Sequence, residues 1–248
     1  MFEQQVSIPT ADGDCRAFTF APEAGGSWPA VLLFMDALAI RPVLFDMCRH
    51  IAAQGYFVLL PDMFYRAGPY EPHDAKAIFA SGDVVGALGM LMSSTNDQKA
   101  ARDCEAFLGF LADCPMVAGR MLGVTGYCMG GATALTAAGL FPDRVACAAS
   151  FHGGFLATAS DLSPHRLADT MRGRIHVGAA QNDPHFTADD EATLRAALDD
   201  AGVDYEIATY AAAHGWTMAD LPVYSPEAAE RHWARLFDLL ESALVPAT

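Results

Sequence analysis

Basic residues are scarce in this chain. Lys and Arg number 15 against 30 for Asp and Glu, so the formal net charge at pH 7 is −15. Such a protein repels a phosphate backbone and cannot gain affinity by releasing its counterions. Nucleic acid and anionic membrane surfaces are therefore poor partners for it.

Long apolar runs and a signal peptide are also missing. No stretch approaches the roughly 20 apolar residues that a membrane-spanning helix needs. The amino-terminal segment MFEQQVSIPTADGD lacks the basic and apolar regions of a secretory signal. We expect a cytoplasmic protein with no membrane partner, while the residues leave its oligomeric state open.

The cysteines form no recognisable framework. None belongs to a CxxC pair, and no His-rich ligand spacing accompanies them, so we expect no disulfide framework and no metal site. Most should be small buried hydrophobic residues. The six are Cys15, Cys48, Cys104, Cys114, Cys128 and Cys147.

Apolar side chains are plentiful: they make up 52% of the 248 residues, against 18% charged residues. This composition is typical of a globular protein with a sizeable core and excludes disorder. No Ser-, Gly- or Pro-rich linker, charge block or internal repeat divides the chain. We therefore predict a single domain over residues 1–248.

Short β-branched or apolar runs alternate with stretches of helical periodicity, which predicts an α/β fold with helices on both faces of a mostly parallel sheet. The turn signal Ala11 to Asp14 makes the first two strands an antiparallel hairpin. Eight strands are predicted, at 4–8, 15–20, 30–35, 57–60, 121–125, 145–150, 174–179 and 205–210. Helices are predicted at 42–54, 97–112, 132–140, 188–201 and 225–244. The least regular segment, Asp62 to Asn96, is expected to overhang the active site.

The sharpest motif is Gly126-Tyr-Cys128-Met-Gly130, which follows a predicted strand and opens a helix. It has the form G-x-C-x-G, a nucleophile elbow with Cys in place of Ser. Glycines two residues either side of the nucleophile leave room for the tight turn. The helix N-terminus behind Cys128 favours a thiolate and can stabilise an oxyanion. The alternative is a buried structural cysteine beside a glycine-rich turn.

A nucleophile elbow requires an acid and then a histidine, each in the loop after a later strand. Asp183 follows the strand predicted at 174–179, and His214 follows the strand predicted at 205–210. Both should therefore lie at the same edge of the sheet as Cys128. Taken singly, Asp183 could be a turn residue and His214 an ordinary loop histidine, but the order of all three favours a catalytic triad.

These motifs together resemble the dienelactone hydrolase family of α/β-hydrolases, over nearly the whole chain from Pro29 onward. The resemblance rests on Gly126 to Gly131, Pro61 to Arg66, the Asp183 loop and Ala213-His214-Gly215. It implies an α/β-hydrolase fold, a Cys-His-Asp triad of Cys128, His214 and Asp183, and no cofactor.

The resemblance also implies an activating carboxylate and two oxyanion donors. The family places a glutamate at the end of the strand before the first long helix, where it holds the resting thiol. This chain has the shorter Asp36 there, which could instead cap the following turn. The oxyanion donors implied are the backbone N–H groups of Met129 and Ala37.

The type enzyme of the family clamps a substrate carboxylate with two arginines, and this chain lacks both. One arginine is expected four residues after the catalytic histidine, where this chain has Met218. The other is expected in the helical region after Pro61-Asp62, but the segment Tyr70 to Thr95 contains no Arg and has Lys76 as its one Lys. Arg66 could substitute, although an ion pair with a neighbour such as Asp62 is its simpler role. The predicted substrate-binding residues are Tyr65, Arg66, Tyr70, His152 and Trp216.

We therefore predict a hydrolase that cleaves a small-molecule ester or lactone through an acyl-thioester intermediate, with His214 accepting the Cys128 proton directly or through Asp36. Two alternatives remain open. One is an acyl transferase or thioesterase with the same triad. The other is a noncatalytic ligand-binding homologue, against which a complete triad argues.

Overall fold

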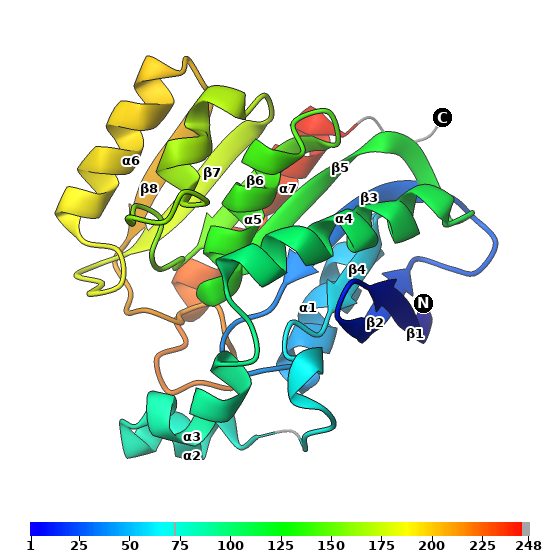
Figure 1. Cartoon of the computed structure of the whole chain (residues 1–248), viewed down its shortest axis with the longest axis horizontal. Coiled ribbons are helices and arrows are strands. Elements are labelled where there is room, and N and C mark those ends of the chain that lie inside the picture. The colour runs from blue at the N-terminus through cyan, green and yellow to red at the C-terminus, as the bar shows by residue number, and fades with distance from the viewer. Residues whose placement is uncertain (72, 245–248) are drawn as a thin grey trace.

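An eight-stranded sheet forms the centre of the computed structural model, which describes residues 1–71 and 73–244 (Figure 1). The strand order is β1-β2-β4-β3-β5-β6-β7-β8. The strand β2 pairs antiparallel with both β1 and β4, and all other pairs are parallel. The predicted strands and amino-terminal hairpin are confirmed. The strands are β1 Phe2–Thr10, β2 Gly13–Ala21, β3 Trp28–Phe34, β4 Phe57–Pro61, β5 Val117–Tyr127, β6 Val145–Phe151, β7 Arg174–Ala180 and β8 Tyr205–Tyr210.

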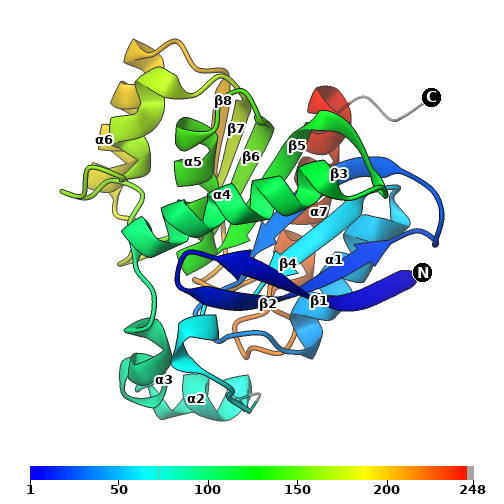
Figure 2. The same cartoon turned by 45° about the vertical axis from the view of Figure 1, so that its right-hand side comes forward.

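Helices cover both faces of this sheet. Helices α4, α5 and α6 lie on one face, and α1 and α7 lie on the other (Figures 1 and 2). Strands β3 and β4 are consequently buried along nearly their whole length, which explains their unbroken apolar sequences. The helices are α1 Pro42–Ala53, α2 Ala75–Ser81, α3 Val84–Met92, α4 Asp97–Asp113, α5 Met129–Leu140, α6 Ala188–Asp200 and α7 Pro226–Ala243, with short 3₁₀ turns at Tyr65–Ala67 and Pro164–Thr170.

The segment predicted to be irregular contains the two short helices α2 and α3. Each begins at an aspartate whose carboxylate accepts a backbone N–H: Asp74 from Ala77, and Asp83 from Gly86. Both helices project beyond the sheet at the edge where the parallel strands end (Figure 2). Within residues 1–71 and 73–244 no single helix is long and apolar enough to cross a membrane, and α2 with α3 reaches that length only as a bent pair.

Helix α5 begins three residues earlier than predicted, directly after Cys128. The helical pattern was visible from Ala132, whereas Gly130 and Gly131 disfavour a helix by their intrinsic propensity. Close packing explains why glycines are needed there, because a Cβ atom on Gly130 would lie 2.5 Å from the carbonyl oxygens of Phe34 and Met35. The start of α5 therefore lies directly against the end of β3.

Candidate active site

Cys128 occupies a strained turn between β5 and α5. Its φ of 53° and ψ of −117° lie outside the regions that ordinary residues prefer. A Cβ atom on Gly126 would lie 1.9 Å from the carbonyl oxygen of Gly130, so the strand and helix can approach this closely only with glycine at that position. Strained backbone of this kind is characteristic of functional turns. The geometry is that of a nucleophile elbow.

His214 and Asp183 meet at the same edge of the sheet. The Nδ1 atom of His214 lies 2.6 Å from Oδ2 of Asp183, and the other carboxylate oxygen accepts the backbone N–H of His185 at 2.9 Å. Asp183 is 5% exposed, whereas His214 reaches the cavity described below. The carboxylate thus fixes the orientation of the imidazole and leaves Nε2 for the thiol side.

The charges around His214 favour its protonated form. Burial alone would lower its pKa, but hydrogen bonds and charge interactions with Asp183 and Cys128 outweigh burial and raise the pKa to about 10. Burial would raise the pKa of Asp183, but the hydrogen bond and charge of His214 lower it overall. The pair is therefore arranged to stabilise an imidazolium.

We expect the Asp183–His214 pair to stabilise the fold most at mildly acidic pH. A histidine whose folded pKa is raised contributes stability below its unfolded pKa of about 6.5, and this contribution is lost as pH rises toward 10. Asp183→Asn should therefore cost more stability at pH 6 than at pH 10, as measured by urea unfolding. The matched control is Asp14→Asn at an exposed position near the start of β2. A cost for Asp183→Asn that is equal at both pH values would contradict the assigned pair.

Two further histidines flank the His214 ring. His152 lies with its ring centre 5.2 Å away, and His185 at 5.1 Å, both edge-on. Burial first, and then the neighbouring His214, hold the pKa of His152 well below its usual range. Its Nε2 atom lies 2.7 Å from Oγ1 of Thr217, three residues beyond His214. A neutral His152 therefore holds the catalytic loop against the end of β6.

Asp36 has a partner that the sequence did not indicate. Its two carboxylate oxygens bind the guanidinium of Arg41, at 2.6 and 2.8 Å, and one of them also accepts the backbone N–H of Leu38 at 3.1 Å. Asp36 and Cys128 both line the cavity. The carboxylate is thus where the prediction placed it, but its charge is balanced by a buried arginine.

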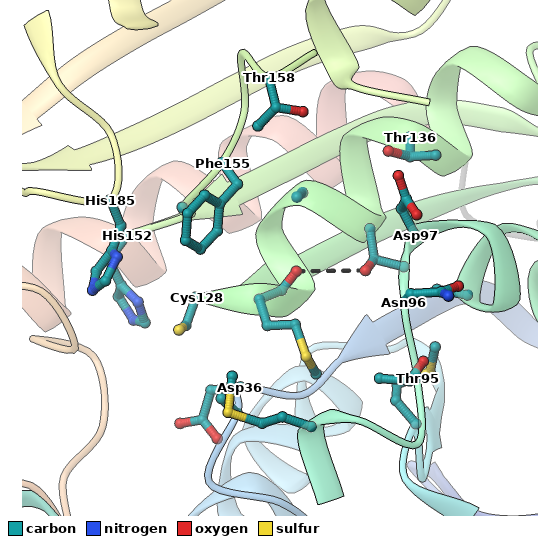
Figure 3. Close-up of a pocket in the computed structure, with 18 of the residues that line it drawn as sticks. Asp36, Thr95, Asn96, Asp97, Cys128, Thr136, His152, Phe155, Thr158 and His185 are labelled. Carbon is teal, nitrogen blue, oxygen red and sulfur yellow. Dashed lines mark hydrogen bonds between the residues drawn. The ribbon is translucent and has the colours of Figure 1, made fainter. Parts of the chain in front are cut away.

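A cavity of about 540 Å³ opens in front of Cys128. Cys128, Asp36, His152 and His185 lie at one end of it, and Thr95, Asn96, Asp97 and Thr136 lie at the other (Figure 3). Most of the wall between is apolar, and among the described residues that line it none is Lys or Arg. The apolar wall includes Leu38, Met63, Phe79, Val84, Met92, Phe155, Leu162 and Leu221.

The cavity includes some of the residues predicted to contact substrate and not others. His152 lines it, as do Ala37 and Met129, whereas the other predicted contacts point elsewhere. Trp216 is fully buried and stacks on Tyr210 with ring centres 4.7 Å apart. Side chains of α2 and α3 supply cavity wall instead, which fits the expected overhang.

A polar network outside the cavity lining contains Tyr65, Arg66 and Tyr70, which the sequence predicts to bind substrate. Arg66 pairs with Asp103 of α4, at 2.7 and 2.8 Å, and also with Asp12. The expected partner of Arg66, Asp62, instead binds Arg16 and Tyr70. These contacts anchor the chain that leads into α2.

Comparison with known proteins identifies the family. The model of the dienelactone hydrolase family matches residues 15–244. The chain belongs to the dienelactone hydrolase family. It is 28% identical over 245 residues to the carboxymethylenebutenolidase of Pseudomonas sp. strain P51, covering 97% of this chain and 96% of that one. The predicted resemblance is thereby confirmed, and the protein is a hydrolase of this family.

Solved structures show the same fold. A dienelactone hydrolase-like promiscuous phosphotriesterase from metagenomic libraries superposes with a TM-score of 0.77 at 21% identity, covering 98% of both chains. The acylaminoacyl peptidase of Pyrococcus horikoshii gives a TM-score of 0.73 at 14% identity and covers 98% of this chain, but only 42% of the peptidase. This dienelactone hydrolase family member is thus an α/β-hydrolase in its fold.

Proposed function

We propose that this dienelactone hydrolase family member cleaves a carboxylic ester or lactone with a Cys128-His214-Asp183 triad. The observation that carries the proposal is the position of Cys128, at a strained elbow that opens into the cavity, with His214 beside it and oriented by Asp183. The carboxymethylenebutenolidase name of its relative supports a lactone or ester as substrate.

In the first half of the reaction, Nε2 of His214 holds the Cys128 proton, as the raised pKa of the imidazole favours, and the thiolate attacks the carbonyl carbon. The carbonyl oxygen becomes an oxyanion, for which we assign the N–H groups of Met129 and Ala37 as donors. The C–O bond then breaks, and His214 returns its proton to the departing alkoxide. The product of this half is an acyl thioester, with the alcohol still attached when the substrate is a lactone.

In the second half, water attacks the thioester and His214 accepts its proton. The C–S bond breaks, and the sulfur leaves as a thiolate beside the imidazolium, so the enzyme returns to its starting state. Asp183 stays ionised throughout and stabilises the imidazolium in both halves. Asp36, held by Arg41, orders the loop that carries the Ala37 donor.

A chromogenic ester screen tests this function directly. We expect a burst of alcohol release equal to the enzyme concentration when deacylation is slow, and a thioester adduct on Cys128 in the mass spectrum. Partition of the acyl group to added alcohol or amine in preference to water would identify an acyl transferase. Binding of the esters without turnover would identify a noncatalytic ligand-binding protein and would overturn the proposal.

We expect neutral substrates to be cleaved at least as well as carboxylated ones. The buried Met218 occupies the position, four residues after His214, where the family's type enzyme has a substrate-binding arginine. Lys76 of α2 is exposed. Arg66 is already paired with Asp103. The ratio of kcat/KM for matched esters ending in a carboxamide or a carboxylate measures this preference. A hundredfold preference for the carboxylate, about 2.7 kcal/mol, would show that another cation binds it.

A further inference from the structure

Arg41 is buried between the two loops that form the reacting end of the cavity. Its side chain is 2% exposed and immediately precedes α1. A guanidinium has five N–H donors, and all five find acceptors here. They bind the two oxygens of Asp36, the carbonyl of Ala39 and the two oxygens of Asp220, at 2.6 to 3.3 Å.

The first of these loops connects β3 to α1 and carries the oxyanion donor assigned to Ala37. Both carboxylate oxygens of Asp36 accept hydrogen bonds from Arg41, and one of them also accepts the Leu38 N–H. Ala39, whose carbonyl accepts the third bond, has a φ of 67°, which is unfavourable for a residue with a side chain. The arginine thus binds this loop at two points, one of which is the strained residue Ala39.

The second loop connects β8 to α7 and carries His214. Asp220, six residues after the histidine, accepts a hydrogen bond from Nε of Arg41 at 2.6 Å, and its side chain is one-third exposed. Thr217 of the same loop binds His152. The loop is therefore fixed at two points, one at the end of β6 and the other on Arg41.

We propose that Arg41 is a positioning residue that couples the oxyanion loop to the His214 loop. The inference rests on the triad function proposed above. A buried guanidinium that bridges two carboxylates sets their separation, because its planar donors have fixed directions. Loss of the bridge lets the histidine and the oxyanion donor move independently, and small displacements of reacting groups are costly in rate.

The bridge also determines where the thiol proton goes. Two bonds from Arg41 and one from the Leu38 N–H occupy three of the roughly four acceptor positions of the Asp36 carboxylate, and the adjacent guanidinium balances its negative charge. The Cys128 proton therefore passes directly to His214. This assigns Asp36 to the bridge, in place of the role of holding the resting thiol that the family resemblance implies.

Asp220→Asn tests the bridge with the least risk to folding, because the buried ion pair between Asp36 and Arg41 is kept. We expect kcat to fall about tenfold with KM within twofold, because binding surfaces in the cavity are unchanged. Arg41→Lys, which has three donors in place of five, should lower kcat further. The matched control is Arg49→Gln on the exposed face of α1, where Arg49 pairs with Glu3 and Asp46.

Alkylation by iodoacetamide gives a readout that needs no substrate. The rate at Cys128, located by mass spectrometry across pH 5 to 10, reports the thiol–imidazole pair, and the half-buried Cys114 is an internal reference. In Asp220→Asn the Cys128 profile should shift while the Cys114 profile does not. If the wild type hydrolyses no ester but Asp220→Asn still shifts the Cys128 profile, the proposed function fails and the positional coupling stands.

Three results would overturn the coupling. One is unchanged kcat and alkylation in Asp220→Asn. Another is additive losses in the Arg41→Lys and Asp220→Asn double variant, since residues that share one contact should be non-additive. The third is hydrogen exchange that accelerates throughout the chain in Asp220→Asn, which would indicate general destabilisation. The coupling predicts faster exchange confined to residues 36–41 and 214–221.

Discussion

Cys128→Ala is expected to lower kcat by at least about a thousandfold, because removal of a nucleophile leaves the contribution of binding and oxyanion stabilisation alone. The substitution removes one sulfur atom from a half-buried position and keeps the elbow backbone, so KM and thermal stability should change little. Steady-state kinetics on a chromogenic ester, with the burst phase resolved, measure the loss. No acyl adduct should form on the variant.

Cys114→Ala provides the matched control, since Cys114 is also half-buried and lies at the end of α4 away from the triad. It should retain wild-type kcat. Cys128→Ser should fold normally yet be a poor nucleophile, because a site arranged for a thiol need not deprotonate an alcohol. Inactivation by iodoacetamide with the label on another cysteine would disprove the assignment of Cys128.

Gly126→Ala is expected to destabilise the protein by about 4 kcal/mol or more, which is exceptional for a single methyl group. The added Cβ atom would lie 1.9 Å from the backbone oxygen of Gly130, and neither group can move without opening the β5–α5 turn. Urea unfolding measures the free-energy change. Any folded variant should also lose activity, because Cys128 lies within the displaced turn.

Gly109→Ala is the matched control, because a Cβ atom at this position in α4 meets nothing within 4 Å beyond its chain neighbours and the adjacent backbone of its own helix. There the substitution should stabilise the helix by about 0.5 to 1 kcal/mol. Full stability and activity in Gly126→Ala would mean that the turn is more open than the structure shows. The nucleophile elbow would then not depend on close approach of β5 and α5.

The fold was predictable because its strands are short, apolar and separated by helical periodicity. Periodicity failed at α2 and α3, which have seven and nine residues and include Gly86 and Gly89. Helices this short depend on tertiary contacts and caps more than on propensity. The sequence does contain their N-cap residues, Asp74 and Asp83. Gly82, with a φ of 70°, ends α2 and separates the two helices.

The triad order was visible in the sequence because each member directly follows a strand. The sequence did not reveal which charged groups pair with one another, since these pairs depend on which loops meet in space. Arg41 and Asp220 are 179 positions apart, and nothing local to either one indicates the other. Arg66 is close to Asp62 in the chain, yet the buried Asp103 of α4 lies directly against its guanidinium. Sequence proximity favoured the wrong carboxylate.

The apolar wall of the cavity bears on how long each acyl-enzyme survives. Water is the second substrate of the reaction, and it must reach the thioester through the same space that the acyl group occupies. An acyl chain long enough to fill the region between Phe79, Met92 and Leu162 displaces that water. We expect long-chain esters to acylate readily and then trap the enzyme, so that turnover slows with chain length while the covalent adduct becomes the dominant species.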